Sequence, residues 1–202
     1  MTVPTIAMIG SAGRQEDARY VTLDLYRSMY REARNAVREW QAVRAVSGGA
    51  AFADHLAVSA FLYGEVKELL LFLPAPFRNG RYVEGTRDRD PGATSNSLHR
   101  RFKEITGIDG LAEIAQAERL GAVLRVIPGF QNRNLEVASS ATCMIAFTFG
   151  RATFRNIVPE QTEFNDPKAA GLKISKGTAH TWGEAWKCTA KTHVNLNELA
   201  DA

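Results

Sequence analysis

The chain has 202 residues, 45% of them hydrophobic and 23% charged, with a formal net charge of +3 and a pI of about 9.0. This composition excludes a disordered or fibrous protein and favours one globular domain over residues 1–202. Lysine and arginine are scattered rather than clustered, which argues against a nucleic-acid partner, and no apolar stretch is long enough to cross a membrane.

The first predicted element is a strand at Thr5–Ile9, a short apolar run of the kind that is buried on both faces of a sheet. It ends in a turn of small residues, Gly10-Ser11-Ala12-Gly13, which Arg14 follows. The turn lacks the GxGxxG spacing, so it predicts no dinucleotide cofactor. A stripe of apolar residues at helical spacing then predicts a helix from about Asp17 to Trp40.

A second strand, Ala42–Val46, leads into the turn Ser47-Gly48-Gly49-Ala50, and a helical pattern follows directly. The first N–H groups of such a helix have no partner and its dipole favours an anion, so this turn predicts a phosphate site. Gly48 and Gly49 would let the phosphate approach the backbone. The alternative is a tight turn with no ligand.

Asp54 lies one turn into this predicted helix. Its carboxylate would meet ribose hydroxyls or act as a base, which makes it the candidate catalytic residue. The alternative is a surface residue that favours the helix dipole.

The remaining strong strands are Glu68–Leu73, Thr142–Phe149 and an edge strand at Thr192–Leu196, whereas Ala122–Ile127 is an ambiguous apolar run. Their order predicts a Rossmann-like α/β fold of three layers, with a mostly parallel five-stranded sheet in the order 3-2-1-4-5. Glycine, proline and charged residues predict an irregular insertion at about 75–110, in which the first helix begins near Ser97.

Three turns follow predicted strands: Gly10–Arg14, Ser47–Ala50, and Gly150 together with Gly177–Thr181. The carboxyl ends of parallel strands share one edge of a sheet, and ligands bind there, so we expect these turns to converge. Arg133 and Asn134 begin a predicted helix that would join the same edge. His180 either donates to a phosphate or is simply a polar residue at a helix start.

The two cysteines, Cys143 and Cys188, have neither Cys-x-x-Cys nor Cys/His spacing, and the histidines form no metal motif. Cys143 lies in an apolar strand and is expected to be a buried free thiol. The N-terminus lacks the pattern of a signal peptide. We therefore expect a cytoplasmic protein without metal or cofactor.

The order of these motifs resembles the SLOG superfamily. The resemblance rests on Ser47-Gly48-Gly49-Ala50 with Asp54, on Arg133-Asn134 before a short helix, and on Gly177-Thr178-x-x-Thr181 at a late helix, and it spans Ile6 to Leu196. That group includes the lonely-guy phosphoribohydrolases, the DprA DNA-processing proteins and the YspA/YpsA-like proteins of phage-type genomes. It implies a homodimer that binds a small-molecule nucleotide.

The late turn departs from the lonely-guy pattern Gly-Gly-x-Gly-Thr-x-x-Glu. Thr181 stands where the glutamate would be, and only one of the glycines is present. Two functions therefore stay open: a nucleotide N-glycosidase resembling the phosphoribohydrolases, with Asp54 as its catalytic residue, or a non-catalytic nucleotide sensor or sequestering protein. The predicted ligand-binding residues are Gly10, Ser11, Arg14, Ser47, Gly48, Gly49, Ala50, Arg133, Asn134, Gly177, Thr178, His180 and Thr181.

Overall fold

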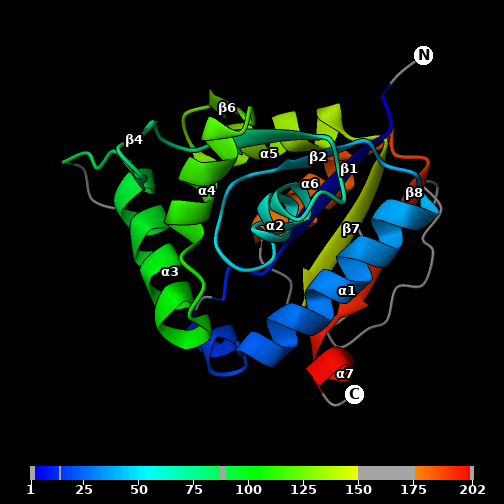
Figure 1. The fold of residues 1–202 in the computed structure, drawn as a ribbon, viewed down its shortest axis with the longest axis horizontal. Coiled ribbons are helices and arrows are strands. Elements are labelled where there is room, and N and C mark those ends of the chain that lie inside the picture. Colours follow the sequence, from blue (N-terminus) through cyan, green and yellow to red (C-terminus); the bar gives the residue numbers. More distant parts are fainter. Residues whose placement is uncertain (1–2, 14, 87–89, 150–175, 201–202) are drawn as a thin grey trace.

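The computed structural model describes residues 3–13, 15–86, 90–149 and 176–200. Its centre is a six-stranded parallel sheet in the order β6-β3-β2-β1-β7-β8, flanked by helices as in Rossmann-like folds (Figure 1). The strands of this sheet are β1 (Thr5–Gly10), β2 (Arg44–Ser47), β3 (Glu68–Leu73), β6 (Val123–Val126), β7 (Cys143–Thr148) and β8 (Ala190–Asn195). The helices are the 3-10 helix η1 (Gln15–Arg19), α1 (Leu23–Glu39), α2 (Leu56–Leu62), α3 (Pro91–Thr106), α4 (Gly110–Arg119), α5 (Phe130–Ser140), α6 (Lys176–Glu184) and α7 (Leu196–Ala200).

The α/β class is confirmed, but the sheet has six strands rather than five, so the count and the full order differ from the prediction. The five predicted strands keep the order 3-2-1-4-5, as β3-β2-β1-β7-β8. The ambiguous run at Ala122–Ile127 contains the sixth strand, β6, which pairs with β3 at the edge of the sheet. Val123 and Val126 of β6 are 49% and 43% exposed. An edge strand of this kind lacks the continuous burial that identifies an interior strand, so its apolar pattern is weak.

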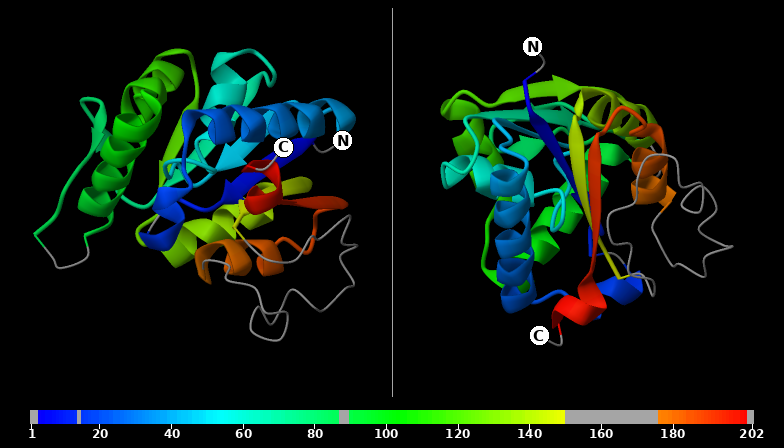
Figure 2. Two further views of the ribbon diagram at one scale, coloured as in Figure 1. Left: turned by 90° about the horizontal axis from the view of Figure 1, so that it is seen from below. Right: turned by 90° about the vertical axis from the view of Figure 1, so that its right-hand side faces the viewer.

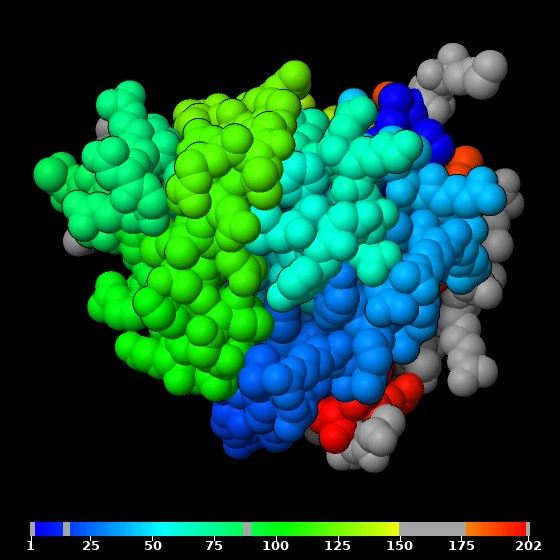
Figure 3. All heavy atoms as spheres, in the orientation of Figure 1, coloured from blue at the N-terminus to red at the C-terminus, as the bar shows by residue number. Residues whose placement is uncertain are grey.

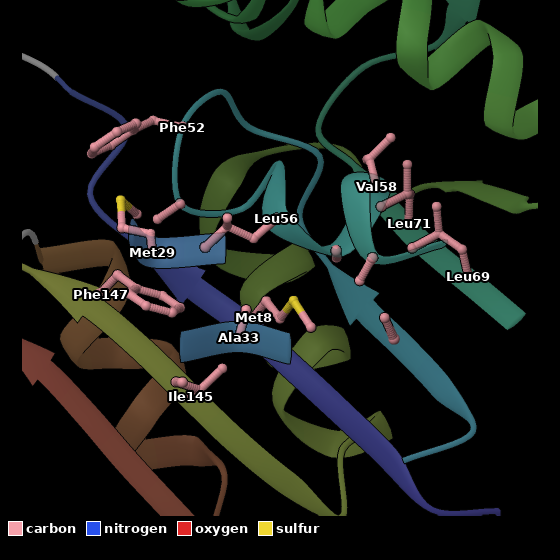
Figure 4. Packing of buried hydrophobic residues seen from close by; sticks show 14 of the residues in the cluster. Met8, Met29, Ala33, Phe52, Leu56, Val58, Leu69, Leu71, Ile145 and Phe147 are labelled. Carbon is pink, nitrogen blue, oxygen red and sulfur yellow. The ribbon is translucent and has the colours of Figure 1, made fainter. Parts of the chain in front are cut away.

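The two faces of the sheet bury alternate residues of the same strands. Met8 and Ile145 face the side that α1 covers, where Met29 and Ala33 pack against the sheet (Figure 4). Ala7, between Ile6 and Met8, belongs to the core of the opposite face, which α5 and α6 cover (Figure 2, right). The side-chain period of two along a strand therefore places one strand in two cores. Complete burial of a side chain such as Met29 contributes about 1.5–3 kcal/mol.

The helix that was predicted from Asp17 begins later, at Leu23. Thr22 caps it, because the Thr22 hydroxyl accepts a hydrogen bond from the Leu25 N–H at 3.0 Å. The preceding residues form the separate 3-10 helix η1. That break places Asp17 beside the turn after β1 rather than on the surface of α1.

The expected helix does not start at the glycine turn after β2. Residues 52–55 form consecutive tight turns, with Phe52 at a φ of 66°, and α2 begins only at Leu56 and has 7 residues. A left-handed residue costs about 1–2 kcal/mol, whereas complete burial of a phenylalanine ring contributes about 1.5–3 kcal/mol. Phe52 is 1% exposed, so burial outweighs the strain. The helix N-terminus expected directly after Ser47–Ala50 is therefore absent from that turn, because α2 starts only at Leu56.

The segment predicted as an irregular insertion is largely ordered. It contains a hairpin, β4 (Phe77–Arg78) and β5 (Arg81–Tyr82), and the helix α3, which begins at Pro91 rather than near Ser97. The carboxylate of Asp90 caps α3 by accepting from the Ala93 N–H at 2.8 Å. Proline at the first position of a helix was mistaken for a loop signal.

The hairpin and α3 lie at one end of the molecule, beside α4 (Figures 1 and 3). None of the described helices is long and apolar enough to span a lipid bilayer.

Candidate functional site

A cavity of about 460 Å³ opens at the carboxyl edge of the sheet, beyond the ends of β1 and β2. The first turns of α5 and α6 form its other walls. Strand β1 lies between β2 and β7. The strands β2 and β3 follow on one side of β1, and β7 and β8 lie on its other side, so the strand order reverses beside β1. Ligands of open α/β sheets bind at such a switch point.

Most of the predicted site residues lie in the wall of this cavity. They are Gly10, Ser11, Gly48, Ala50, Asp54, Arg133, Asn134, Gly177, Thr178, His180 and Thr181. Ser47 and Gly49 are not in the wall, and both are buried. Arg14 and Gly150 lie outside the described residues.

Arg133 and Asp54 form a buried ion pair in the wall. Nη1 of Arg133 donates to Oδ2 of Asp54 at 3.0 Å, and the two side chains are 10% and 8% exposed. The guanidinium passes over Gly48, where a Cβ atom would lie 0.8 Å from Nη1. Gly48 therefore makes room for the guanidinium of Arg133.

Ser47 closes the turn that contains Asp54. Its hydroxyl donates to the Asp54 carbonyl oxygen at 2.8 Å and accepts from the Gly49 N–H at 3.3 Å. The Gly49 N–H is thus engaged within the protein. Gly49 has a φ of 67° and lies against Leu73 and Tyr82, so glycine is required there by the fold.

The turn after β1 is held by Ser11. Its N–H donates to the Phe147 carbonyl at 2.8 Å, and its hydroxyl donates to Oδ2 of Asp17 at 2.7 Å. A Cβ atom at Gly10 would lie 2.1 Å from the Phe147 carbonyl oxygen, so the approach of β7 requires glycine. Asp17 also lines the cavity and adds a second carboxylate that sequence reasoning did not select.

Side-chain hydrogen bonds tie α6 to α5 and to β1. Asn134 donates through Nδ2 to the Gly177 carbonyl at 3.2 Å, and the Thr178 hydroxyl donates to the Gly10 carbonyl at 3.0 Å. The Thr181 hydroxyl also donates to the Gly177 carbonyl, at 2.9 Å. These bonds bring the turn after β1 and the first turn of α6 together in one wall with α5.

Two buried nitrogen atoms of the wall are unsatisfied among the described residues. Nε of Arg133 and Nδ1 of His180 are buried and make no hydrogen bond there. Gly129 precedes α5 without a side-chain cap, so the N-terminal turn of that helix also lacks a capping acceptor. Buried polar groups are normally paired, and a bound ligand is one way to satisfy them.

Several wall residues were missed: Ile9, Ala12, Asp17, Phe130, Gln131 and Val137. Phe130 lies three residues before Arg133, and Gln131 three residues before Asn134, so their helical spacing was a usable signal. Asp17 gave no such signal, because only the break between η1 and α1 turns it toward the cavity. The described residues contain no group of three or more His, Cys, Asp or Glu side chains placed to hold a metal ion.

No protein-family model matches the chain. The chain is 33% identical over 153 residues to the uncharacterized protein R261 of Acanthamoeba polyphaga mimivirus, and the match covers 75% of this chain and 70% of that protein. Identity at this level over most of both chains is a relationship of whole folds rather than of one motif. The chain therefore belongs to the same protein family as R261 of the mimivirus.

Proposed function

We propose that the protein binds a nucleotide or nucleotide derivative in the cavity at the carboxyl edge of the sheet. One observation carries this proposal: the N-terminal turns of α5 and α6 meet at this cavity beside the buried, unsatisfied Nε of Arg133. A helix N-terminus carries roughly half a positive charge, which suits a phosphate. A volume of about 460 Å³ is in the range of small-molecule sites.

The rest of the wall provides groups for the other parts of a nucleotide. The carboxylates of Asp17 and Asp54 are acceptors for ribose hydroxyls, since both line the cavity. Ile9, Val137 and the ring of Phe130 form the apolar part of the wall, against which a base would pack. Arg133 compensates Asp54, so the phosphate would depend on the helix N-termini more than on a free arginine.

The reaction that fits these groups is cleavage or transfer at the N-glycosidic bond. As that bond breaks, positive charge develops on the ribose, and the Asp54 carboxylate would stabilise it. The base leaves with the bonding electron pair and gains a proton, and the attacking water or acceptor hydroxyl releases one as its oxygen bonds to the anomeric carbon, so the step balances. Arg133 would orient the Asp54 carboxylate throughout.

One observation favours the alternative, a non-catalytic nucleotide sensor or sequestering protein. The Thr181 hydroxyl, at the position of the lonely-guy glutamate, donates to a backbone carbonyl at 2.9 Å. It offers neither a carboxylate nor a free acid or base to the cavity. Binding without turnover is the expected behaviour if this position is essential for hydrolysis.

Calorimetric titration with the four nucleoside 5′-monophosphates and NAD, followed by chromatography for free base, tests both functions. A ligand that binds only the folded state raises its stability, so a thermal shift should accompany binding. Asp54→Asn should abolish base release, whereas Asp24→Asn, which removes the carboxylate of an exposed ion pair on α1, should not. Absence of binding to every compound refutes the proposal, and binding without base release selects the sensor.

Membership of the SLOG superfamily, in its phage-type branch, and homodimerisation are further parts of this proposal. Their support is the order of the motifs that meet in the cavity. Light scattering coupled to size-exclusion chromatography measures the oligomeric state, and a monomer at micromolar concentration would contradict the dimer.

A further inference from the structure

The Gly49 carbonyl accepts two hydrogen bonds from the segment that was predicted to be an irregular insertion. The Tyr82 hydroxyl donates to it at 2.6 Å, and Nε2 of His99 lies 3.1 Å from it. Tyr82 is 0% and His99 1% exposed, and neither lines the cavity. The two donors therefore act on the glycine turn from the protein interior.

Both donors are held rigidly. Asn96 pairs with the backbone of Tyr82, accepting its N–H at 3.0 Å and donating to its carbonyl at 2.9 Å. The Tyr82 ring stacks on the His99 ring with 6.0 Å between centroids. Gly110 leaves room for the imidazole, since a Cβ atom there would lie 2.6 Å from Nδ1 of His99.

The imidazole of His99 is neutral at ordinary pH. Burial away from solvent is the main cause that lowers the pKa of His99 to about 3. A neutral imidazole has one N–H, and the Gly49 carbonyl requires it on Nε2. His99 and Tyr82 are therefore two fixed neutral donors on one acceptor.

The geometry of the peptide unit relates this carbonyl to the cavity. The described chain has no cis peptide bond, so the Gly49 C=O and the Ala50 N–H point in opposite directions. The carbonyl points to Tyr82 and His99, and Ala50 lines the cavity. The Ala50 N–H makes no hydrogen bond within the described parts of the chain.

We propose that Tyr82 and His99 are positioning residues that lock the Gly49–Ala50 peptide so that the Ala50 N–H donates to an oxygen of the ligand in the cavity. That this oxygen belongs to a phosphate or a ribose rests on the proposed function. The fixed orientation of the Gly49–Ala50 peptide is a property of the protein without ligand. Glycine at position 49, with its φ of 67°, would otherwise allow this peptide to flip.

The test combines Tyr82→Phe, His99→Leu and the double variant. Tyr26→Phe is the matched control, because it removes another buried hydroxyl, which lies 2.9 Å from the Ser59 hydroxyl and does not touch Gly49. Calorimetry with adenosine, guanosine, cytidine and uridine 5′-monophosphates measures binding. Hydrogen exchange of the Gly49 amide, which is bonded to Ser47, measures the lock without ligand.

Each single variant keeps one donor, so binding should weaken by less than about threefold, whereas the double variant should lose more than about tenfold and show faster Gly49 exchange. Tyr26→Phe should change neither quantity. Equal effects in Tyr26→Phe, or a double variant that binds and exchanges like the wild type, overturn the lock. If the wild type binds neither these four compounds nor NAD, the proposed function fails, and exchange in the double variant alone supports or overturns the lock.

Discussion

Gly48→Ala tests whether the Arg133–Asp54 ion pair requires a residue without a Cβ atom at position 48. The added Cβ would lie 0.8 Å from Nη1 and 2.0 Å from Cζ of Arg133, so the guanidinium must move. Gly48 has no positive φ, so the backbone itself accepts alanine without strain. The whole effect of the substitution should therefore pass through Arg133 and its contact with Asp54.

The expected loss follows from the burial of the pair. Removing one partner of a fully buried ion pair costs roughly 3–5 kcal/mol, because a charge is left unpaired. The Arg133 and Asp54 side chains are 10% and 8% exposed and line an open cavity, so water can partly hydrate them. We therefore expect Gly48→Ala and Arg133→Ala each to lower the free energy of unfolding by about 2 kcal/mol.

The double variant, Gly48→Ala with Arg133→Ala, distinguishes a steric effect on Arg133 from a general loss of stability. Once Arg133 is alanine, the space above Gly48 is vacant, so Gly48→Ala should add less than about 0.5 kcal/mol. Urea unfolding with an unchanged slope measures each value. Arg27→Ala, which breaks an exposed pair with Asp24, is the control and should change stability by less than about 1 kcal/mol. Additive losses in the double variant would refute the steric coupling.

Two further predictions concern titratable groups in the core. Burial lowers the pKa of His193 to about 4 and the pKa of His99 to about 3. The pKa of a histidine in the unfolded chain is about 6.5. The unfolded state therefore binds more protons than the folded state as the pH falls. The free energy of unfolding should therefore decrease between about pH 6.5 and pH 4, and His193→Gln should reduce that decrease by about 1–3 kcal/mol. A pH profile of stability that is the same in the variant and the wild type would contradict the role of His193. Burial also raises the pKa of the Cys143 thiol to about 12 and that of the Cys188 thiol to about 11. A disulfide reagent at pH 8 should therefore label both thiols only in urea. Labelling of the native protein would show that the thiols are accessible.

Sequence reasoning identified the interior strands well because their signal is local. Apolar runs such as Thr5–Ile9 and residues 69–73 are buried along most of their length, and no distant contact is needed to recognise them. The edge strand β6 was ambiguous because three of its four residues are exposed to water. The start of α3 was missed because Pro91 and Gly92 have the composition of a loop, although proline also begins helices.

The sequence by itself determined which turns meet at the carboxyl edge, since the direction of parallel strands places every strand end there. Gly10, Gly48 and Gly177 were brought together by that rule alone. Only the tertiary structure decided what each group does. Asp54 is paired with Arg133, 79 residues away, and the glycine turn is held by Tyr82 and His99. Periodicity describes one segment at a time, whereas these contacts join segments far apart in the chain and depend on how the layers pack.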